Sequence, residues 1–251
     1  MERDSSSLLE RSALVLDSFP GGTALTLAEV CARTGLPRST THRVLVSLAN
    51  LGWLTRTGNK FELGMALFEL GERVAIKHSL RSAALPFMQD LFAVTEQTVH
   101  LAVRDRFDAV YVEKIHGRSA MPFPSHTGGR LPLTCTAVGK ALLASEDPDV
   151  VAEVLAQPLR RCTPNSITDP KRLALEIDSV RRTGVASERE ESAIGGCCVA
   201  APVTMAGKPV AALSVSVPKA QFRPELLAPA VRTAALSLSR VLSRGSTARE
   251  S

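Results

Sequence analysis

The sequence predicts an α+β protein of two domains, and three observations support this class. The chain has 251 residues, which exceeds one typical domain and falls short of three. Its first eighty residues carry the period of short helices, interrupted by glycine and proline. Beyond residue 81, helical segments alternate with strand-like runs that come in hairpin pairs, which indicates an antiparallel sheet flanked by helices.

Three short helices are expected in the first fifty residues. Apolar residues repeat with a helical period over residues 8–19, before the breaker Pro20-Gly21-Gly22. Thr26 followed by Glu29 is a capping-box pattern and predicts the start of a second helix. Gly35 supplies a turn, and a third helix is predicted over residues 38–50. Two short helices joined by a glycine-containing turn are typical of a helix-turn-helix.

The third helix has two different faces. Its inner face carries Thr41, Val44, Leu45 and Leu48. The outer face holds Ser39, Arg43, Val46, Ser47 and Asn50, flanked by Thr40 and His42, with Arg38 at its start. Short hydroxyls and arginines without acids can enter a major groove and contact bases and phosphates, whereas a merely solvated face usually mixes in Asp or Glu.

A basic hairpin is predicted after this helix. The segment WLTRTGNKFEL reads as two short strands around a Thr57-Gly58-Asn59 turn, with Arg56 and Lys60 beside the turn. A turn flanked by two basic residues is suited to contact the phosphate backbone or the minor groove of DNA. Trp53 and Phe61 are expected to pack the hairpin against the helices.

Charge and composition restrict the class of protein further. The net charge is +5 and the pI about 9.2, which permits nucleic-acid binding without proving it. Residues 30–61 contain no Asp or Glu, although such a stretch also occurs on ordinary solvated faces. The N-terminal MERDSSS does not resemble a signal peptide, and no apolar run approaches the roughly 18 residues of a membrane span. We therefore expect a cytoplasmic protein with no membrane partner.

The cysteines predict neither disulfides nor a metal site. They are Cys31, Cys135, Cys162, Cys197 and Cys198, an odd number without CxxC spacing. We expect free thiols, and neither a metal nor a cofactor.

The remaining chain predicts the second domain. Helices are expected over residues 65–79, 81–95, 136–145, 148–156, 170–182 and 224–243, and strands over residues 98–103, 109–115, 197–205 and 209–217. The helix over residues 65–79 places Leu67, Leu70 and Val74, with Leu63 before it, on one apolar stripe that should pack against something. An ordinary core helix would carry the same stripe.

The segment TLAEVCARTGLPRSTTHRVLVSLANLGWLTRTGNKFELG closely resembles the winged helix-turn-helix of the isocitrate lyase regulator (IclR) family. The match runs through TGLP, the ST-x-HR-x-L of the recognition helix, L-x-x-LGWL and the closing LG. It continues in order through GGRLPLTCTAVGKALLAS, TPNSITDPKRL, RRTGVASEREESAIGGCCVAAPV and GKPVAALSVSVP. The resemblance is nearly end to end, which is more specific than one helix-turn-helix match.

This resemblance implies a ligand-responsive transcriptional regulator, with repression as the expected mode. Residues 1–64 would be the winged helix-turn-helix domain, residues 65–80 the linker and dimerisation helix, and residues 81–246 an effector domain like the GAF sensor domains. The DNA-contacting residues would be Arg38, Ser39, Thr40, His42, Arg43, Ser47, Asn50, Arg56 and Lys60. Expected partners are palindromic double-stranded operator DNA, a small effector such as an organic or aromatic acid, and a second copy of the chain. Pairing of dimers into tetramers stays open.

The resemblance also places the effector site. The positions carried over are Ala137, Val138, Glu188, Cys198, Ser214 and Ser216. The strand pattern supports the two serines independently, because they alternate with apolar residues and so point to one face. Bonding to nearby backbone is the alternative role for the serines, and core packing for Cys198.

Glu188 limits what can be inferred about the effector from the relatives. Glu188 is longer than the Asp expected in some of them, and a carboxylate ligand would need a donor such as Arg130 to compensate it. Gly196 would open space beside this site, while Met121 and Phe123 would border it.

Two other function classes are alternatives to a DNA-binding regulator. An enzyme would use Cys198, His100 and Glu188 as nucleophile, base and orienting group, but no nucleophile elbow, phosphate loop or paired metal-ligand histidines accompany them. A protein-docking adaptor would have negligible DNA affinity even at low salt. A DNA binder instead predicts a salt slope near −0.9 per neutralised phosphate.

Overall fold

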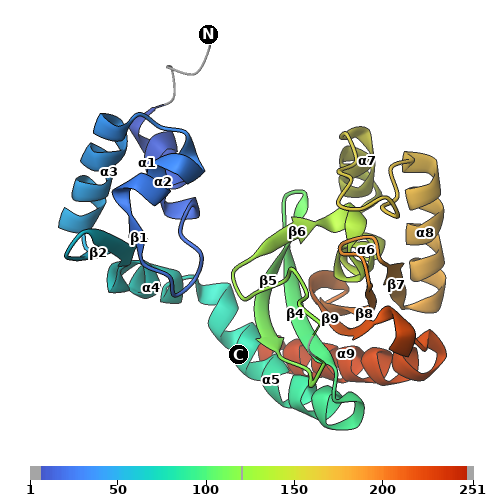
Figure 1. The fold of residues 1–251 in the computed structure, drawn as a ribbon. Helices are drawn as coiled ribbons and strands as arrows, with labels where there is room; N and C mark the ends of the chain where they lie inside the picture. The colour runs from blue at the N-terminus through green and yellow to red at the C-terminus, as the bar shows by residue number, and fades with distance from the viewer. Residues whose placement is uncertain (1–6, 120, 248–251) are drawn as a thin grey trace. The chain divides into compact units, whose positions relative to one another are not determined.

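The computed structural model describes residues 7–119 and 121–247, and the chain forms two compact units, Met1–Ile76 and Lys77–Ser251 (Figure 1). The N-terminal unit contains α1 (Leu8–Asp17), β1 (Leu25–Thr26), α2 (Leu27–Thr34), α3 (Arg38–Asn50), β2 (Leu54–Thr57), β3 (Lys60–Leu63) and α4 (Met65–Glu72).

Local sequence signals account for the elements of the N-terminal unit. The N–H of Thr26 donates to Glu29 Oε2 at 2.7 Å and the N–H of Glu29 donates to Thr26 Oγ1 at 3.4 Å, so the predicted capping box starts α2. Gly35 ends α2 with φ at 69°, a conformation that glycine adopts without steric cost. The three strands form one antiparallel sheet in the order β1-β3-β2, and Phe61 of β3 is buried in the core, as expected.

The expectation of one helix over residues 65–79 is wrong. Helix α4 ends at Glu72, and α5 (Ala75–Thr95) begins three residues later and includes most of the helix predicted separately over residues 81–95. The N–H groups of Arg73 and Val74 donate to Leu70 and Gly71 carbonyls, each three residues back, so the chain tightens and leaves the α-helical ladder. Gly71, a poor helix former, lies in the turn where the helix ends.

The C-terminal unit is built on a six-stranded antiparallel sheet in the order β6-β5-β4-β9-β8-β7. The strands are β4 (Thr98–Asp105), β5 (Asp108–Ile115), β6 (Arg130–Pro132), β7 (Ala186–Arg189), β8 (Gly196–Met205) and β9 (Lys208–Pro218). The helices besides α5 are η1 (Leu133–Cys135), α6 (Ala137–Ala144), α7 (Pro148–Ala156), α8 (Pro170–Thr183), η2 (Lys219–Gln221) and α9 (Pro224–Thr247). The α+β class with an antiparallel sheet is therefore confirmed.

Helices cover both faces of this sheet, so that it separates two apolar cores. On one face, α5 and α9 pack on the strands with Leu213 and Val215 of β9. On the other face, α6, α7 and α8 pack on Ala102, Ala200 and Ala212 (Figure 1). Small residues on this second face leave room above the strands, and a pocket lies there. None of the helices in the described ranges combines the length and apolar character needed to span a membrane.

Candidate functional sites

The outer face of α3 is exposed and carries no acid. Arg38, Ser39, His42, Arg43, Ser47 and Asn50 are exposed and Thr40 is half-buried, whereas Thr41, Val44, Leu45 and Leu48 lie in the core. Pro37 precedes the helix without a side-chain cap, so the first N–H groups of α3 are available to an anion. The division of faces predicted from the sequence is therefore observed.

The hairpin after α3 presents two bases. Thr57 pairs with Lys60, so the turn consists of Gly58 and Asn59, and both Arg56 and Lys60 are exposed. Arg56 Nε donates to the Gly58 carbonyl at 3.0 Å, and its guanidinium lies 5.6 Å from the centre of the Phe61 ring. Arg56 is thus held in place beside the turn, while Lys60 extends from the same hairpin.

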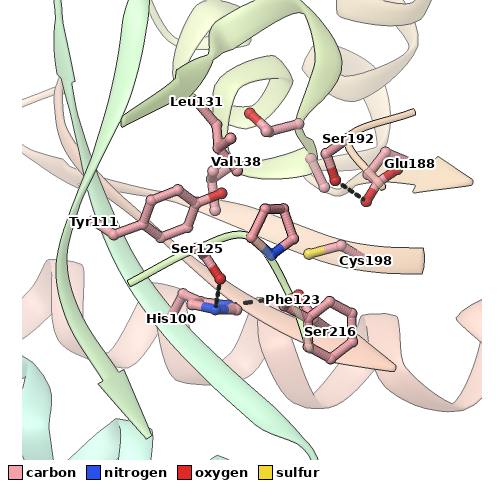
Figure 2. Close-up of a pocket in the computed structure, with 13 residues that line it drawn as sticks. His100, Tyr111, Phe123, Ser125, Leu131, Val138, Glu188, Ser192, Cys198 and Ser216 are labelled. Atoms are coloured by element: carbon pink, nitrogen blue, oxygen red, sulfur yellow. Dashed lines mark hydrogen bonds between the residues drawn. The ribbon is translucent and has the colours of Figure 1, made fainter. Parts of the chain in front are cut away.

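A polar pocket lies between the sheet and α6 in the C-terminal unit. It is lined by His100, Tyr111, Phe123, Pro124, Ser125, Leu131, Thr136, Ala137, Val138, Glu188, Ser192, Cys198 and Ser216 (Figure 2). The free volume at its centre is about 20 Å³, enough for a water molecule. An aromatic ring does not fit this free volume, so lining residues would have to move to admit one.

The structure brings together five of the six effector positions expected from the sequence. Ala137 and Val138 come from α6, Glu188 from β7, Cys198 from β8 and Ser216 from β9. Ser214 shares the face of Ser216, as the alternation predicts, but it does not line the pocket. Its Oγ is buried and has no hydrogen-bond partner in the described structure.

His100 at the floor of the pocket was not expected as a ligand-binding residue. It bonds Ser125 Oγ through Nε2 at 2.7 Å and Ser216 Oγ through Nδ1 at 3.5 Å, and Tyr111 packs edge-on against its ring. Burial lowers the pKa of His100 to about 3, and the charges of Lys114 and His116 act in the same direction. The imidazole is therefore neutral, so it donates to one of the two hydroxyls and accepts from the other.

Among the described residues that line the pocket, Glu188 is the one acid. Its carboxylate accepts from the Glu191 N–H at 2.8 Å and from Ser192 Oγ at 3.1 Å. Burial raises the pKa of Glu188 to about 7, although the hydrogen bond from Glu191 opposes this shift. Near neutral pH both the protonated and the ionised form of this residue are therefore populated.

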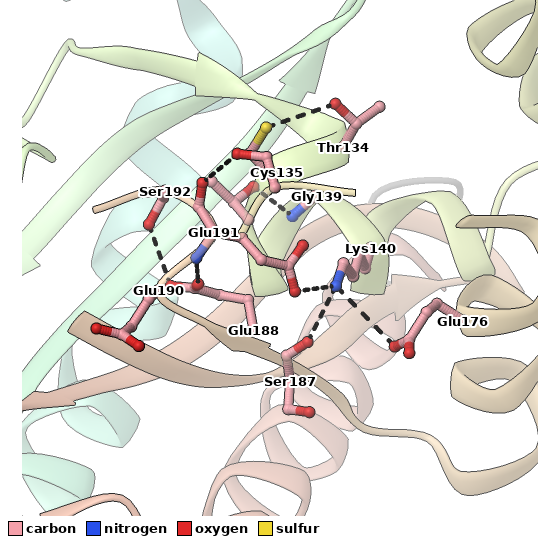
Figure 3. Close-up of polar contacts among 12 residues, drawn as sticks. Thr134, Cys135, Gly139, Lys140, Glu176, Ser187, Glu188, Glu190, Glu191 and Ser192 are labelled. Atoms are coloured by element: carbon pink, nitrogen blue, oxygen red, sulfur yellow. Dashed lines mark hydrogen bonds and ion pairs between the residues drawn. The ribbon is translucent and has the colours of Figure 1, made fainter. Parts of the chain in front are cut away.

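A buried ion pair fixes the loop that follows Glu188. Lys140 of α6 is 1% exposed, and its Nζ donates to Glu191 Oε1 at 2.7 Å and to the Ser187 carbonyl at 3.3 Å (Figure 3). Because the N–H of Glu191 holds Glu188, the Lys140–Glu191 pair orients the pocket carboxylate indirectly.

The first turn of α6 offers hydrogen-bond donors to the pocket. Thr136 caps the helix by accepting from the Gly139 N–H at 3.1 Å. The N–H groups of Ala137 and Val138, which line the pocket, have no acceptor within the helix itself. This end of the helix is suited to a negatively charged or carbonyl oxygen.

Two expectations about neighbouring residues need correction. Arg130 does not compensate Glu188, because its guanidinium pairs with Asp105 and it does not line the pocket. Phe123 borders the pocket as expected, whereas Met121 does not line it and lies beside Gly196 with Phe123.

In the described structure the Cys198 thiol donates to the Val199 carbonyl at 3.8 Å, and no hydrogen bond joins it to His100. Burial raises the pKa of the Cys198 thiol to about 12, and the nearby Glu188 charge acts in the same direction. His100 bonds two serines instead of activating this thiol. The five cysteines are free thiols, and the described residues include no group of His, Cys, Asp and Glu that could hold a metal ion.

Both units match models of known protein families. Residues 8–58 match the IclR helix-turn-helix domain, and residues 72–240 match the family described as bacterial transcriptional regulator IclR C-terminal. The HTH-type transcriptional regulators KdgR of Dickeya chrysanthemi and Escherichia coli K12 are 34% and 35% identical to this chain. These matches cover 78% and 80% of the chain, and 66% and 78% of those proteins.

A repressor and a solved structure also match. The HTH-type transcriptional repressor AllR of Escherichia coli K12 is 27% identical, over 85% of this chain and 81% of that protein. The crystal structure of an IclR homologue from Microbacterium hydrocarbonoxydans, complexed with 4-hydroxybenzoate, superposes with a TM-score of 0.83. It is 32% identical and covers 95% of this chain and 100% of its own.

Proposed function

The chain belongs to the IclR family of transcriptional regulators, and we propose that it binds operator DNA through α3 and the Arg56–Lys60 hairpin under the control of a small organic acid. Family membership makes it a DNA-binding regulator with an effector-binding C-terminal domain. The residue roles, the mode of regulation and the class of effector are the proposed parts.

The acid-free outer face of α3 is the observation that carries the DNA-binding proposal. Its arginines and short polar side chains are exposed together, and the hairpin adds two bases nearby in the chain. In this arrangement α3 enters the major groove, Arg43 and Asn50 contact base edges or phosphates, and Lys60 contacts the backbone. We propose repression as the mode, in line with the name of the relative AllR.

Replacing Arg43 with alanine is expected to weaken binding to a selected operator by about 10- to 100-fold, because a lost arginine contact is worth about 1–3 kcal/mol. The operator is obtained by selection from random-sequence duplexes, and affinity is measured by fluorescence anisotropy at several salt concentrations. If Arg43 contacts a phosphate, the salt slope should also fall by about one.

The matched control is Arg172→Ala, which removes an exposed arginine from α8 in the other unit. This variant should bind the operator as the parent does. An equal loss in the two variants would show that only the overall charge matters, and would argue against α3 as the recognition helix.

The effector proposal is supported by the chemistry of the pocket. The carboxylate of an organic acid is proposed to accept from the Ala137 and Val138 N–H groups, with Ser216 and Cys198 beside it and His100 on the floor. The solved relative complexed with 4-hydroxybenzoate makes that acid the first probe. Because the free volume is about 20 Å³, acids smaller than benzoate are the second.

A second copy of the chain is the proposed third partner. Apolar side chains on α4 and next to it are exposed: Leu63, Met65, Phe68, Leu70 and Val74. We propose that residues 1–64 and 81–246 are the two domains and that residues 65–80 link them. The exposed apolar surface fits a second role of this linker, in dimerisation. A two-fold dimer would recognise a palindromic operator, and its size in solution is measurable by sedimentation.

A further inference from the structure

The pocket that we assign to an organic acid contains an unbalanced charge. Glu188 is 4% exposed and lines the pocket, and the lining residues within the described part of the chain include no arginine or lysine (Figure 2). The imidazole of His100, which also lines it, is held neutral by burial. An acid anion that entered beside an ionised Glu188 would therefore place two negative charges in one enclosed space.

The two lysines whose charges act on pocket residues are engaged elsewhere. Lys140 Nζ lies between Glu191, the Ser187 carbonyl and, at 4.0 Å, the carboxylate of Glu176 (Figure 3). Lys114 Nζ donates to the carbonyl of Ser125 at 2.6 Å, and the hydroxyl of the same serine bonds His100. Neither reaches the pocket as a free positive charge.

Several titratable groups surround Glu188. The charge of Glu191, in the loop after β7, raises the pKa of Glu188, and the charge of Lys140 of α6 lowers it. Lys140 forms its ion pair with Glu191. Its charge therefore lowers the pKa of Glu188 less than that of an unpaired lysine would. Burial raises the pKa of each of the other groups, so they are neutral near pH 7; they are the thiols of Cys197 and Cys198 of β8 and of Cys162 before α8, and the phenol of Tyr111 of β5.

We propose that an acid effector binds this pocket as an anion together with one proton, which Glu188 holds, so that effector binding is coupled to proton uptake. This inference rests on the proposed effector function. The proton comes from solvent and converts the Glu188 carboxylate to a carboxylic acid. The oxygen that keeps the proton then donates to the effector, while the other still accepts from the Glu191 N–H.

The coupling has a direction that can be measured. Below about pH 6 Glu188 already carries the proton, so an anion binds without further uptake. As pH rises above 7, ligand-free Glu188 ionises, and affinity for an anion should fall toward about tenfold per pH unit. An uncharged analogue should show no such dependence.

The test is calorimetric titration of the full chain with 4-hydroxybenzoate and with its amide, 4-hydroxybenzamide. Each titration is run at pH 6 and pH 8 in buffers of different ionisation enthalpy, which gives the number of protons taken up. Uptake with the acid should be larger at pH 8 than at pH 6 and should approach one proton as pH rises, and uptake with the amide should be near zero. No uptake by the parent with the acid at pH 8 would overturn the inference.

Two variants separate the possible sources of charge balance. Glu188→Gln keeps one acceptor and one donor in the same place, so it should bind the acid with no proton uptake at either pH. Lys114→Met should leave both affinity and uptake as in the parent. If Lys114→Met lost acid binding and the parent took up no proton, Lys114 and not a protonated Glu188 would balance the negative charge of the effector.

Failure of 4-hydroxybenzoate as the effector is recognised separately, because it would appear as no binding of either probe at any pH. The Glu188 inference is then decided by thermal unfolding of the ligand-free parent and Glu188→Gln between pH 4.5 and 8. A raised pKa stabilises the fold at low pH, so the Tm of the parent relative to the variant should fall up to about pH 7 and then level off. Parallel curves would overturn the inference.

Discussion

Replacing Gly139 with alanine is expected to lower the unfolding free energy of the C-terminal unit by about 3 kcal/mol, and its melting temperature by roughly 6–12 °C. A Cβ at this position would lie 2.1 Å from the Leu133 carbonyl oxygen and 2.4 Å from Leu133 Cα. Both atoms belong to the backbone of η1, so no side chain can rotate away. The first turn of α6 would move, and with it Ala137 and Val138, which line the pocket.

The control for this prediction is a glycine-to-alanine change in another helix. Gly71 in α4 has open space around its Cβ position, so Gly71→Ala should be neutral or stabilising by up to about 1 kcal/mol. Thermal unfolding followed by circular dichroism compares the two variants with the parent. Equal melting of Gly139→Ala and the parent would show that η1 and α6 do not pack as described.

Replacing Lys140 with methionine is expected to destabilise the same unit by about 3–5 kcal/mol near pH 8, because it leaves Glu191 buried without its partner. Burial already raises the pKa of Glu191, and the loss of Lys140 would raise it further. Glu191 can then take up a proton at lower pH, so the loss of stability should shrink as pH falls through this raised pKa.

A double variant separates loss of the ion pair from loss of the lysine side chain. Lys140→Met combined with Glu191→Gln removes both charges and should recover much of the stability. Urea unfolding at pH 5.5 and pH 8 gives the free energies for the parent, the single and the double variant. Equal destabilisation of the single and double variants at both pH values would contradict a buried ion pair.

Local sequence signals predicted the N-terminal unit well because each boundary has a local cause. The Thr26–Glu29 capping box, the left-handed Gly35 and the uniform apolar period fix α2 and α3 within a few residues. The break between α4 and α5 was missed because the apolar stripe continues through it. A tightened turn after Gly71 changes the backbone without interrupting the pattern.

The pocket could be predicted only in part because its residues come from six strands, from α6 and from segments of irregular chain. The resemblance supplied Ala137, Val138, Glu188, Cys198 and Ser216. The alternation of Thr98, His100 and Ala102 with Val99 and Leu101 could have placed His100 on the same face of the sheet. Its proximity to Ser125 could not be foreseen, because Ser125 lies in irregular chain between β5 and β6. The strands β6 and β7, of three and four residues, are too short for their alternation to be recognised.

Ser214 shows where strand alternation stops being informative. The pattern gave its face correctly, yet the pocket takes Ser216 and not Ser214. Which residue along a strand meets the pocket depends on register, and Ser216 lies opposite Cys198 whereas Ser214 lies opposite Ala200. Register is set by tertiary pairing that a single strand's sequence does not encode.

Linkage between the two sites is tested most directly by measuring operator affinity with and without an acid that stabilises the C-terminal unit in thermal unfolding. At a saturating concentration of that acid, affinity for the selected duplex should change by about 5- to 150-fold, which corresponds to a coupling of about 1–3 kcal/mol. The change should be absent in a Ser216→Ala variant that no longer binds the acid. Unchanged operator affinity, with the acid bound and stabilising the parent, would contradict the proposal that this pocket controls DNA binding.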